Sequence, residues 1–206
     1  MSIGFVFSPG WSLGRDFFKP LSECLKTYPQ VYLKDNPDLR EGIWIGIGHS
    51  LGFARLLSLP LQGVVSLSGF VRFCAHTSSQ NGTATRVMNR MITKFKANPH
   101  EVLKDFYKQA AMENFLTRAL ISFNKRQLLV DLELMKRMDL TSELSGLRIP
   151  ILSLAAKDDK IVPFALTQET FQSSTTLEKG GHAIALTQAD WCAKEINNWI
   201  VDAFNL

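Results

Sequence analysis

The sequence predicts an α/β protein in which a mainly parallel β-sheet is flanked by helices and interrupted by one inserted helical segment. Short apolar runs alternate with longer amphipathic segments along the 206 residues, which is the pattern of βα units around a parallel sheet. Between two of these runs, Gly63–Gly69 and Pro150–Ala155, about 80 residues carry no strand signal, a length that no ordinary loop reaches. We therefore expect one domain, with a core at residues 1–69 and 139–206 and a helical lid at residues 70–138.

The individual elements follow from apolar periodicity and from turn residues. Ile43–Ile47 is the clearest buried strand, because it is β-branched or aromatic at most positions and is bounded by glycines. In chain order, the predicted core elements are a strand at Ile3–Phe7, a turn at Ser8–Gly10, a helix at Phe17–Tyr28, a weak strand at Val31–Lys34, the strand at Ile43–Ile47, a helix at Leu51–Leu59, strands at Gly63–Gly69 and Pro150–Ala155, a helix at Ala165–Gln172, a short strand near Thr175–Leu177 and a helix at Ala189–Phe204. Helices are expected in the lid at Ala84–Lys96, Pro99–Met112 and, with a break, Leu116–Arg137.

Composition narrows the class of protein. The chain has 46% hydrophobic and 20% charged residues, as soluble globular proteins do. No apolar run approaches the roughly 18 residues of a membrane span, and the N-terminus has no basic leader, so we expect neither a membrane segment nor a signal peptide. The three cysteines are too few for a disulfide framework or a zinc site. A cytoplasmic monomer without metal or cofactor is the expectation.

The positive charge is concentrated in the expected lid. The formal net charge is +4, but residues 70–137 hold 12 Lys and Arg against 5 Asp and Glu, while the rest of the chain holds 11 against 14. Nucleic-acid binding is not expected, because the charge is confined to one insertion and no nucleic-acid-binding motif accompanies it.

A candidate nucleophile lies where the clearest strand meets a helix. Gly48–Gly52 reads Gly-His-Ser-Leu-Gly, which matches G-x-S-x-G in the strand–turn–helix context that a nucleophile elbow requires. Glycine two residues to either side of Ser50 is needed on steric grounds, because the sharp turn brings strand and helix backbone close together. The alternative is a glycine-rich turn with no chemistry.

A serine hydroxyl needs a base, and the chain has only four histidines. His49 adjoins Ser50 on a sharp turn, where neighbouring side chains point apart, and His76 and His100 fall among polar residues of the lid. His182 follows two glycines after the last predicted strand, so its imidazole can project over the carboxyl edge of the sheet. We therefore predict His182 as the general base.

The third member of a triad should be a carboxylate that follows the strand before His182. Asp158 and Asp159 both lie there, and Asp159 is preferred because it stands before Ile161-Val162-Pro163 in a D-x-[IV]-V-P arrangement. Asp158 remains the alternative, although adjacent aspartates in a loop are ordinarily solvated. The order serine, aspartate, histidine differs from that of chymotrypsin-like and subtilisin-like enzymes.

An oxyanion hole requires two N–H donors. The backbone N–H of Leu51, which follows the nucleophile, is the first candidate. In the loop after the first strand, Pro9 has no N–H, so the backbone N–H of Trp11 is the second, with Gly10 supplying backbone freedom. The Trp11 side chain could equally be a core aromatic.

With Gly10-Trp11, Gly48–Gly52, Asp159 and Gly181-His182 in this order, the chain resembles the α/β-hydrolase superfamily along nearly its whole length. A narrower resemblance, over Leu129–Leu152, is to the pimeloyl-[acyl-carrier protein] methyl ester carboxylesterases of biotin synthesis. That family cleaves a methyl ester through a serine triad. The chain begins at what would be the third strand, so the resemblance implies a reduced sheet. Pro9-Gly10 stands where the family has His-Gly, and His49 where tryptophan is common.

The narrower resemblance also implies a partner. In that family a basic lid docks the acidic acyl-carrier protein, which would give a role to Arg86, Arg90, Lys104 and Lys108. Basic residues recur at four-residue spacing in two sets on the expected lid helices, one made of Arg86, Arg90 and Lys94 and the other of Lys104 and Lys108. Charged helical stripes are otherwise ordinary solvated faces. The competing hypotheses are a general carboxylesterase or thioesterase with the same triad and, in another class, a hydrolase scaffold that binds a ligand without turnover.

Overall fold

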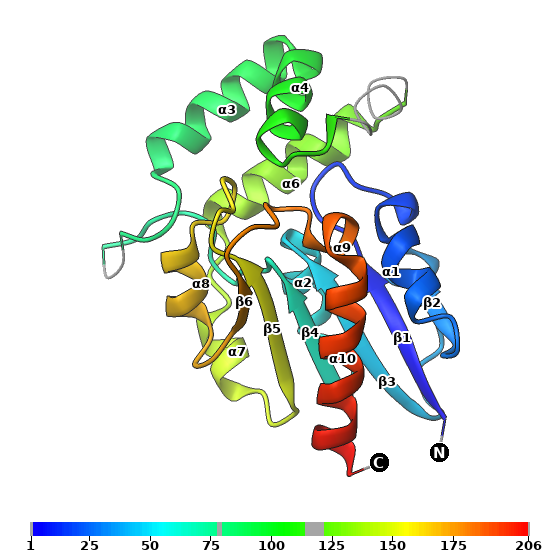
Figure 1. Ribbon diagram of the computed structural model, residues 1–206. Helices are drawn as coiled ribbons and strands as arrows, with labels where there is room; N and C mark the ends of the chain where they lie inside the picture. The colour runs from blue at the N-terminus through cyan, green and yellow to red at the C-terminus, as the bar shows by residue number, and fades with distance from the viewer. Residues whose placement is uncertain (1, 78–79, 114–121, 206) are drawn as a thin grey trace.

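The computed structural model describes residues 2–77, 80–113 and 122–205. Within these ranges six parallel strands form one sheet in the order β2-β1-β3-β4-β5-β6 (Figure 1). The strands are β1 (Ile3–Ser8), β2 (Gln30–Tyr32), β3 (Ile43–His49), β4 (Gly63–Leu67), β5 (Ile151–Ala156) and β6 (Thr175–Leu177). The predicted α/β class with a mainly parallel sheet is confirmed.

Helices cover both faces of the sheet. One face carries α1 (Lys19–Cys24), α9 (Ile184–Thr187) and α10 (Ala189–Phe204), which contact one another. The other carries α2 (Leu51–Leu56) and α7 (Thr141–Gly146), and Phe53 and Leu56 of α2 share one hydrophobic cluster with Leu144 of α7. α8 (Phe164–Thr170) precedes β6, and two 3₁₀ helices, η1 (Arg15–Phe18) and η2 (Leu33–Asp35), complete the core.

Three helices of the inserted segment lie above the carboxyl ends of the strands, as Figure 1 shows. They are α3 (Thr85–Ala97), α4 (Pro99–Gln109) and α6 (Lys125–Arg137), and α3 contacts both of the others. α6 begins at an Asn124 cap, whose side chain accepts a hydrogen bond from Gln127 N at 3.0 Å. The predicted helix began at Leu116, but residues 114–121 lie outside the described residues. We refer to α3, α4 and α6 together as the lid helices.

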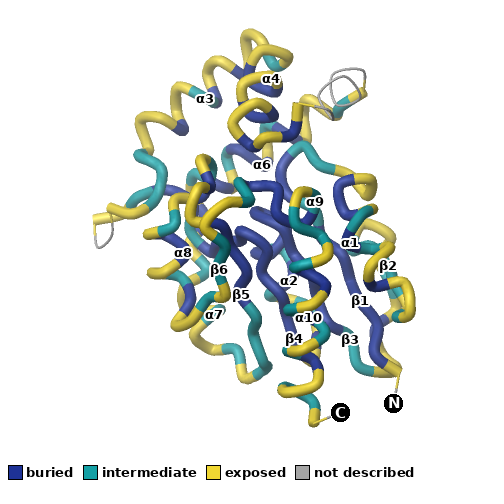
Figure 2. Tube along the Cα trace, in the orientation of Figure 1, coloured by how far each residue is buried: buried dark blue, intermediate teal, exposed yellow. Residues whose placement is uncertain are grey.

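The central strands are the most deeply buried part of the chain. Every residue of β1 and β4 is buried, and Figure 2 shows these strands as a dark layer between exposed helical surfaces. Fully covered strands read as continuous apolar runs because both of their faces contact helices. This explains why the central strands could be predicted from the sequence.

The strand order creates a switch point at the carboxyl edge of the sheet. The chain leaves β1 through α1 on one face to reach β2, and leaves β3 through α2 on the other face to reach β4. The loops after β1 and β3 therefore diverge, and in open parallel sheets ligands bind in the crevice at such a point. Residues Gly10–Leu13 and Ser50 occupy these two loops.

Three predicted helices were wrong in extent. The helix predicted at Phe17–Tyr28 is divided into η1 and the short α1. Pro20 lies in the first turn of α1, where its missing N–H is tolerated, whereas one continuous helix from Phe17 would place it further inside. The helix predicted to Leu59 ends at Leu56, and the helix predicted to Met112 ends at Gln109.

Candidate active site

Ser50 occupies a strained turn between β3 and α2. Its backbone angles are φ 55° and ψ −126°, a region that residues with a Cβ avoid. Holding a residue there costs on the order of 1–3 kcal/mol and persists only where the surroundings enforce it. The buried strand on one side and the helix on the other supply that constraint.

The glycines flanking Ser50 are required by close backbone contacts. A Cβ added at Gly48 would lie 2.4 Å from the Cα of Phe53, and one added at Gly52 would lie 1.9 Å from the carbonyl oxygen of Ser8. Neither contact can be relieved by rotating a side chain, because both involve backbone. The G-x-S-x-G spacing is therefore a packing requirement of this turn.

His182 and Asp159 form a buried pair. His182 Nδ1 lies 2.8 Å from Asp159 Oδ2, and the two side chains are 0% and 2% exposed. The second carboxylate oxygen, Oδ1, accepts hydrogen bonds from Ile161 N at 2.7 Å and Val162 N at 2.9 Å. Since a carboxylate accepts, His182 Nδ1 carries the proton and Nε2 is left as the basic nitrogen.

The environment of Asp159 favours its ionised form. Burial by itself would raise the pKa of this carboxyl, but the facing His182 and the hydrogen bonds from His182, Val162 and Ile161 hold its pKa below the usual value. Asp159 thus stays charged beside the imidazole, which is the state that stabilises an imidazolium.

Asp158 lies in a different arrangement from Asp159. Its Oδ1 accepts hydrogen bonds from Gly180 N at 3.0 Å and Gly181 N at 2.8 Å. Gly181 has φ +66°, which suits glycine, and it immediately precedes His182. Asp158 therefore holds the loop that carries His182, whereas Asp159 contacts its ring.

The basic nitrogen of His182 has no hydrogen-bond partner within the described residues. Ser50 is 5% exposed and opens onto the cavity described below, but the structure records no hydrogen bond between its hydroxyl and His182. In free hydrolases this contact is often long and shortens when substrate binds. The Asp159–His182 half of the candidate triad is preformed.

The candidate oxyanion donors flank Ser50. Leu51 is the first residue of α2, so its N–H has no acceptor within that helix. A Cβ added at Gly10 would lie 3.0 Å from the Cβ of Ser50, which places the loop containing Trp11 directly against the serine. The Trp11 side chain, 2% exposed, belongs to the hydrophobic core and also lines the cavity.

A cavity of about 400 Å³ opens beside Ser50 under the lid helices. Most of its lining is apolar, and three of the apolar residues are flexible methionines. The apolar residues are Trp11, Phe73, Val87, Met88, Met91, Val102, Phe106, Met135 and Ile161. The polar residues of the lining include Arg90, Lys94, Asp105 and Lys160. This lining suits an apolar acyl or alkyl chain, because methionines adapt to ligands of different shape.

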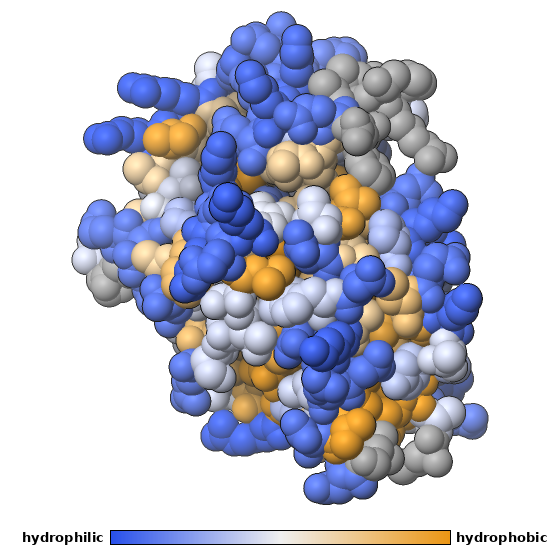
Figure 3. Space-filling model, in the orientation of Figure 1, coloured by the Kyte–Doolittle hydropathy of each residue, from blue (hydrophilic) through white to orange (hydrophobic). Residues whose placement is uncertain are grey.

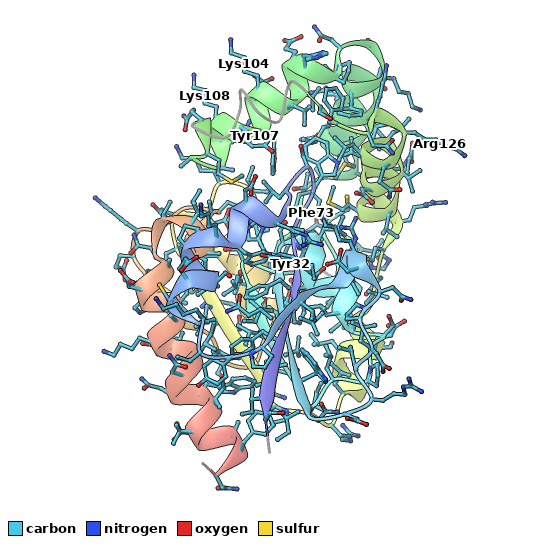
Figure 4. All side chains as sticks on the ribbon, turned by 90° about the vertical axis from the view of Figure 1, so that its right-hand side faces the viewer. Tyr32, Phe73, Lys104, Tyr107, Lys108 and Arg126 are labelled. Carbon is cyan, nitrogen blue, oxygen red and sulfur yellow. The ribbon has the colours of Figure 1, made fainter. Side chains whose placement is uncertain are left out.

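The basic residues predicted on the lid are all exposed, but the structure does not bring all of them to one place. Arg90 lines the cavity, whereas Arg86, Lys104 and Lys108 do not. Figure 4 shows Lys104 and Lys108 pointing away from the body of the molecule while Tyr107, on the same helix, points toward it. The surface over α3 and α4 is mostly hydrophilic in the view of Figure 3.

One member of the predicted basic stripe on α3 is neutralised. Lys94 Nζ lies 2.7 Å from Glu101 Oε1 and 2.9 Å from Asp105 Oδ2, both on α4. These ion pairs join the two helices and reduce the free positive charge that the four-residue spacing suggested. Such exposed pairs contribute little to stability.

His49 is a residue whose place the sequence analysis missed. It is fully buried, its ring centroid lies 4.6 Å from that of His182, and its Nε2 lies 3.0 Å from the His182 carbonyl oxygen. Because a carbonyl only accepts, His49 Nε2 carries a proton and donates it. His49 therefore holds the backbone of the candidate base, a role for which its position beside Ser50 was the only sequence signal. His76 and His100 are exposed.

Burial of His49 gives a testable pH dependence of stability. Burial, and to a smaller extent the neighbouring His182, lower the pKa of His49 to about 3. The unfolded chain, with a pKa near 6.5, takes up a proton that the folded chain does not. The stabilisation is complete above about pH 6.5 and is lost as the pH falls toward about pH 3.

We expect His49→Gln, which keeps an amide donor but cannot titrate, to flatten this dependence. Between about pH 7.5 and pH 4.5 the wild type should lose about 2–3 kcal/mol more unfolding free energy than the variant. Urea unfolding at both pH values measures the difference. His100→Gln, at an exposed position on α4, should keep the wild-type dependence. Equal pH dependence in wild type and His49→Gln would contradict the assignment.

Comparison with known proteins supports the fold and leaves the chemistry open. No family model matches the sequence, and no curated protein matches it. An esterase (EaEST) from Exiguobacterium antarcticum superposes with a TM-score of 0.85 at 12% identity, covering 97% of this chain and 92% of its own. A bromoperoxidase from Bacillus anthracis gives 0.84 at 14%, covering 97% and 92%. An enol-lactonase from Burkholderia xenovorans LB400 gives 0.78 at 14%, covering 98% and 92%.

Esterase, bromoperoxidase and lactonase are names for different reactions, so likeness at this identity defines the fold alone. No helix in the described part of the chain combines the length and apolarity needed to cross a membrane. The sheet order, the elbow at Ser50 and these superpositions agree with one another. The chain has the α/β-hydrolase fold over nearly its whole length.

Proposed function

We propose that this protein is a serine carboxylic ester hydrolase with Ser50 as nucleophile, His182 as general base and Asp159 as the acid that orients the base. One observation carries the proposal: the buried Asp159–His182 pair packs against His49, the residue before a serine that is held in a strained turn and opens into an apolar cavity. A scaffold that only binds a ligand has no need of a buried carboxylate facing an imidazole, because a buried charge is costly to desolvate.

The chemistry proceeds through an acyl-enzyme. His182 Nε2 accepts the proton of Ser50 as its oxygen attacks the ester carbonyl, and Asp159 stabilises the resulting imidazolium. The N–H groups of Leu51 and Trp11 bind the oxyanion of the tetrahedral intermediate. His182 then protonates the departing alcohol. A water molecule, deprotonated by His182, releases the acid and restores Ser50.

For the substrate, we propose the methyl ester of pimeloyl-[acyl-carrier protein], the biotin precursor. The apolar lining beside Ser50 suits an alkyl chain, and the exposed Arg86, Arg90, Lys104 and Lys108 suit an acidic carrier protein. A carrier would remain outside, since a protein cannot enter a cavity of about 400 Å³. A general carboxylesterase or thioesterase would share the triad but would not depend on these charges.

The substrate proposal is tested by removing charge from the lid. We expect Lys104→Ala/Lys108→Ala to lower kcat/KM severalfold for the methyl ester of pimeloyl-[acyl-carrier protein] and to leave hydrolysis of a short p-nitrophenyl ester unchanged. The loss should shrink at high salt, because exposed charges are screened. Lys26→Ala/Lys194→Ala removes the same charge from exposed positions outside the lid and serves as the control.

Two outcomes would contradict the carrier substrate. Efficient turnover of the p-nitrophenyl ester with none of the carrier ester would indicate a general esterase. Equal effects of the lid pair and the control pair on the carrier ester would show that the lid charges do not dock it.

A further inference from the structure

The loop that contributes Trp11 is fastened to all three lid helices. The indole Nε1 of Trp11 donates a hydrogen bond to the carbonyl oxygen of Leu128 in α6 at 3.0 Å. The same ring packs edge-on against Phe106 of α4 and Phe95 of α3, with centroids 5.0 and 5.7 Å apart. Trp11 is thus held by side chains and backbone that come from the inserted segment.

A second hydrogen bond holds the next residue of this loop. The hydroxyl of Tyr107 in α4 donates to the carbonyl oxygen of Ser12 at 2.7 Å, and the Tyr107 side chain points from α4 toward the body of the molecule (Figure 4). Tyr107 is only 2% exposed. Ser12 has φ 62°, a conformation that serine rarely adopts without external constraint. Tyr107 therefore fixes a strained backbone position directly after Trp11.

The lid is also joined to α2, the helix that begins with the other candidate oxyanion donor, Leu51. Arg55 lies on α2, one turn after Leu51, and its guanidinium is 2.7 Å from the buried carboxylate of Asp131 in α6. Asp131 Oδ1 also accepts a hydrogen bond from Gln127 at 3.0 Å. Helix α6 thus contacts the loop after β1 through Leu128 and helix α2 through Asp131.

We infer that the lid helices set the geometry of the oxyanion hole, with Tyr107 as a positioning residue that acts through Ser12 on the N–H of Trp11. This inference rests on the proposed function. The physical reason is that an oxyanion donor works only when it is held at hydrogen-bond distance from the developing charge before the reaction starts. The Tyr107–Ser12 and Trp11–Leu128 hydrogen bonds provide that constraint from above the loop, while contact between Gly10 and Ser50 provides it from below.

The test is Tyr107→Phe, which removes one hydroxyl and keeps the ring. We expect kcat for a short p-nitrophenyl ester to fall roughly tenfold, less than the roughly 10²–10³-fold that follows outright removal of an oxyanion donor. KM should change by less than about twofold, because the ground-state ester does not depend on that donor. The inhibition constant of a trifluoromethyl ketone, whose adduct with Ser50 carries an oxyanion, should rise by about the same factor as kcat/KM falls.

A matched variant separates positioning from a general loss of one hydrogen bond. Tyr28→Phe removes a hydroxyl that donates to Asn197 at 3.0 Å, between the segment after α1 and helix α10. We expect it to leave kcat and the inhibition constant unchanged. Trp11→Phe, which removes the Nε1 donor but keeps an aromatic ring, should lower kcat in the same manner as Tyr107→Phe.

The outcomes distinguish this inference from the proposed function. If the wild type hydrolyses esters, and Tyr107→Phe matches Tyr28→Phe in kcat and in ketone inhibition, the inference is overturned and the proposed function stands. A rise in KM alone would also overturn it. If the wild type neither hydrolyses esters nor reacts with a fluorophosphonate, the proposed function fails and the inference fails with it.

Discussion

Replacing Ser50 with alanine should abolish ester hydrolysis, with a fall in kcat of roughly 10⁶-fold, the size of loss seen when a triad nucleophile is removed. The reason is that the Ser50 hydroxyl is the group proposed to form the acyl-enzyme: it opens into the cavity from the strained turn, and the residue before it, His49, packs against the ring of His182. Hydrolysis of a p-nitrophenyl ester measures the loss. Covalent labelling by a fluorophosphonate should disappear in the same variant.

Ser68 offers a closely matched control for Ser50. It also has a left-handed backbone, with φ 49°, it is 1% exposed, and its hydroxyl has no hydrogen-bond partner among the described residues. Ser68→Ala therefore also places alanine at a position of positive φ, without removing the candidate nucleophile, and we expect it to keep activity and labelling. If Ser50→Ala retained full esterase activity, the proposed function would be wrong.

Asp159→Asn should lower kcat by roughly 10⁴-fold, the loss recorded when a triad aspartate is converted to asparagine. The amide keeps the size of the carboxylate but presents an N–H to His182 Nδ1, so the imidazole must place its proton on Nε2 and can no longer accept one from Ser50. The amide oxygen can still accept the hydrogen bonds of Ile161 and Val162, so the loop should remain folded. Measurement of kcat over the neutral pH range tests this.

The adjacent aspartate provides the control for this prediction. Asp158 accepts two backbone hydrogen bonds through Oδ1, and the amide oxygen of asparagine can accept both. Asp158→Asn should therefore retain kcat within a few-fold. A larger loss in Asp158→Asn than in Asp159→Asn would reverse the assignment of the two residues and restore the alternative that the sequence left open.

Much of the core was predictable because it is controlled by local signals. The boundaries of α10, Ala189–Phe204, and of β6, Thr175–Leu177, agree with those predicted, and the buried strands agree within about two residues at each end. A strand covered on both faces must be apolar along its length, and a helix on a sheet must be apolar on one side, so both leave a periodic pattern in the sequence. For the same reason, the sequence predicted that Ser50, Asp159 and His182 follow the ends of strands.

Other features depend on contacts between residues that are distant in sequence. Tyr107 and Ser12 are 95 positions apart, and Trp11 and Leu128 are 117 positions apart. No local sequence pattern could therefore predict either hydrogen bond. The choice between Asp158 and Asp159 also needed coordinates, because both follow the same strand. The neutralisation of Lys94 by two residues of α4 removed charge that the spacing on α3 had suggested was free.

The sequence by itself determined the α/β class, the inserted helical segment and the candidates for a triad, namely Ser50, His182 and one of two adjacent aspartates. Hydrophobic periodicity and the steric need for glycine are properties of short stretches of chain. Only the tertiary structure decided which aspartate contacts His182, where His49 lies, and how the lid helices hold the loop beside Ser50. These three features depend on side chains that come together only after the chain has folded. A few tenths of an ångström in donor–acceptor distance then decide whether a hydrogen bond forms.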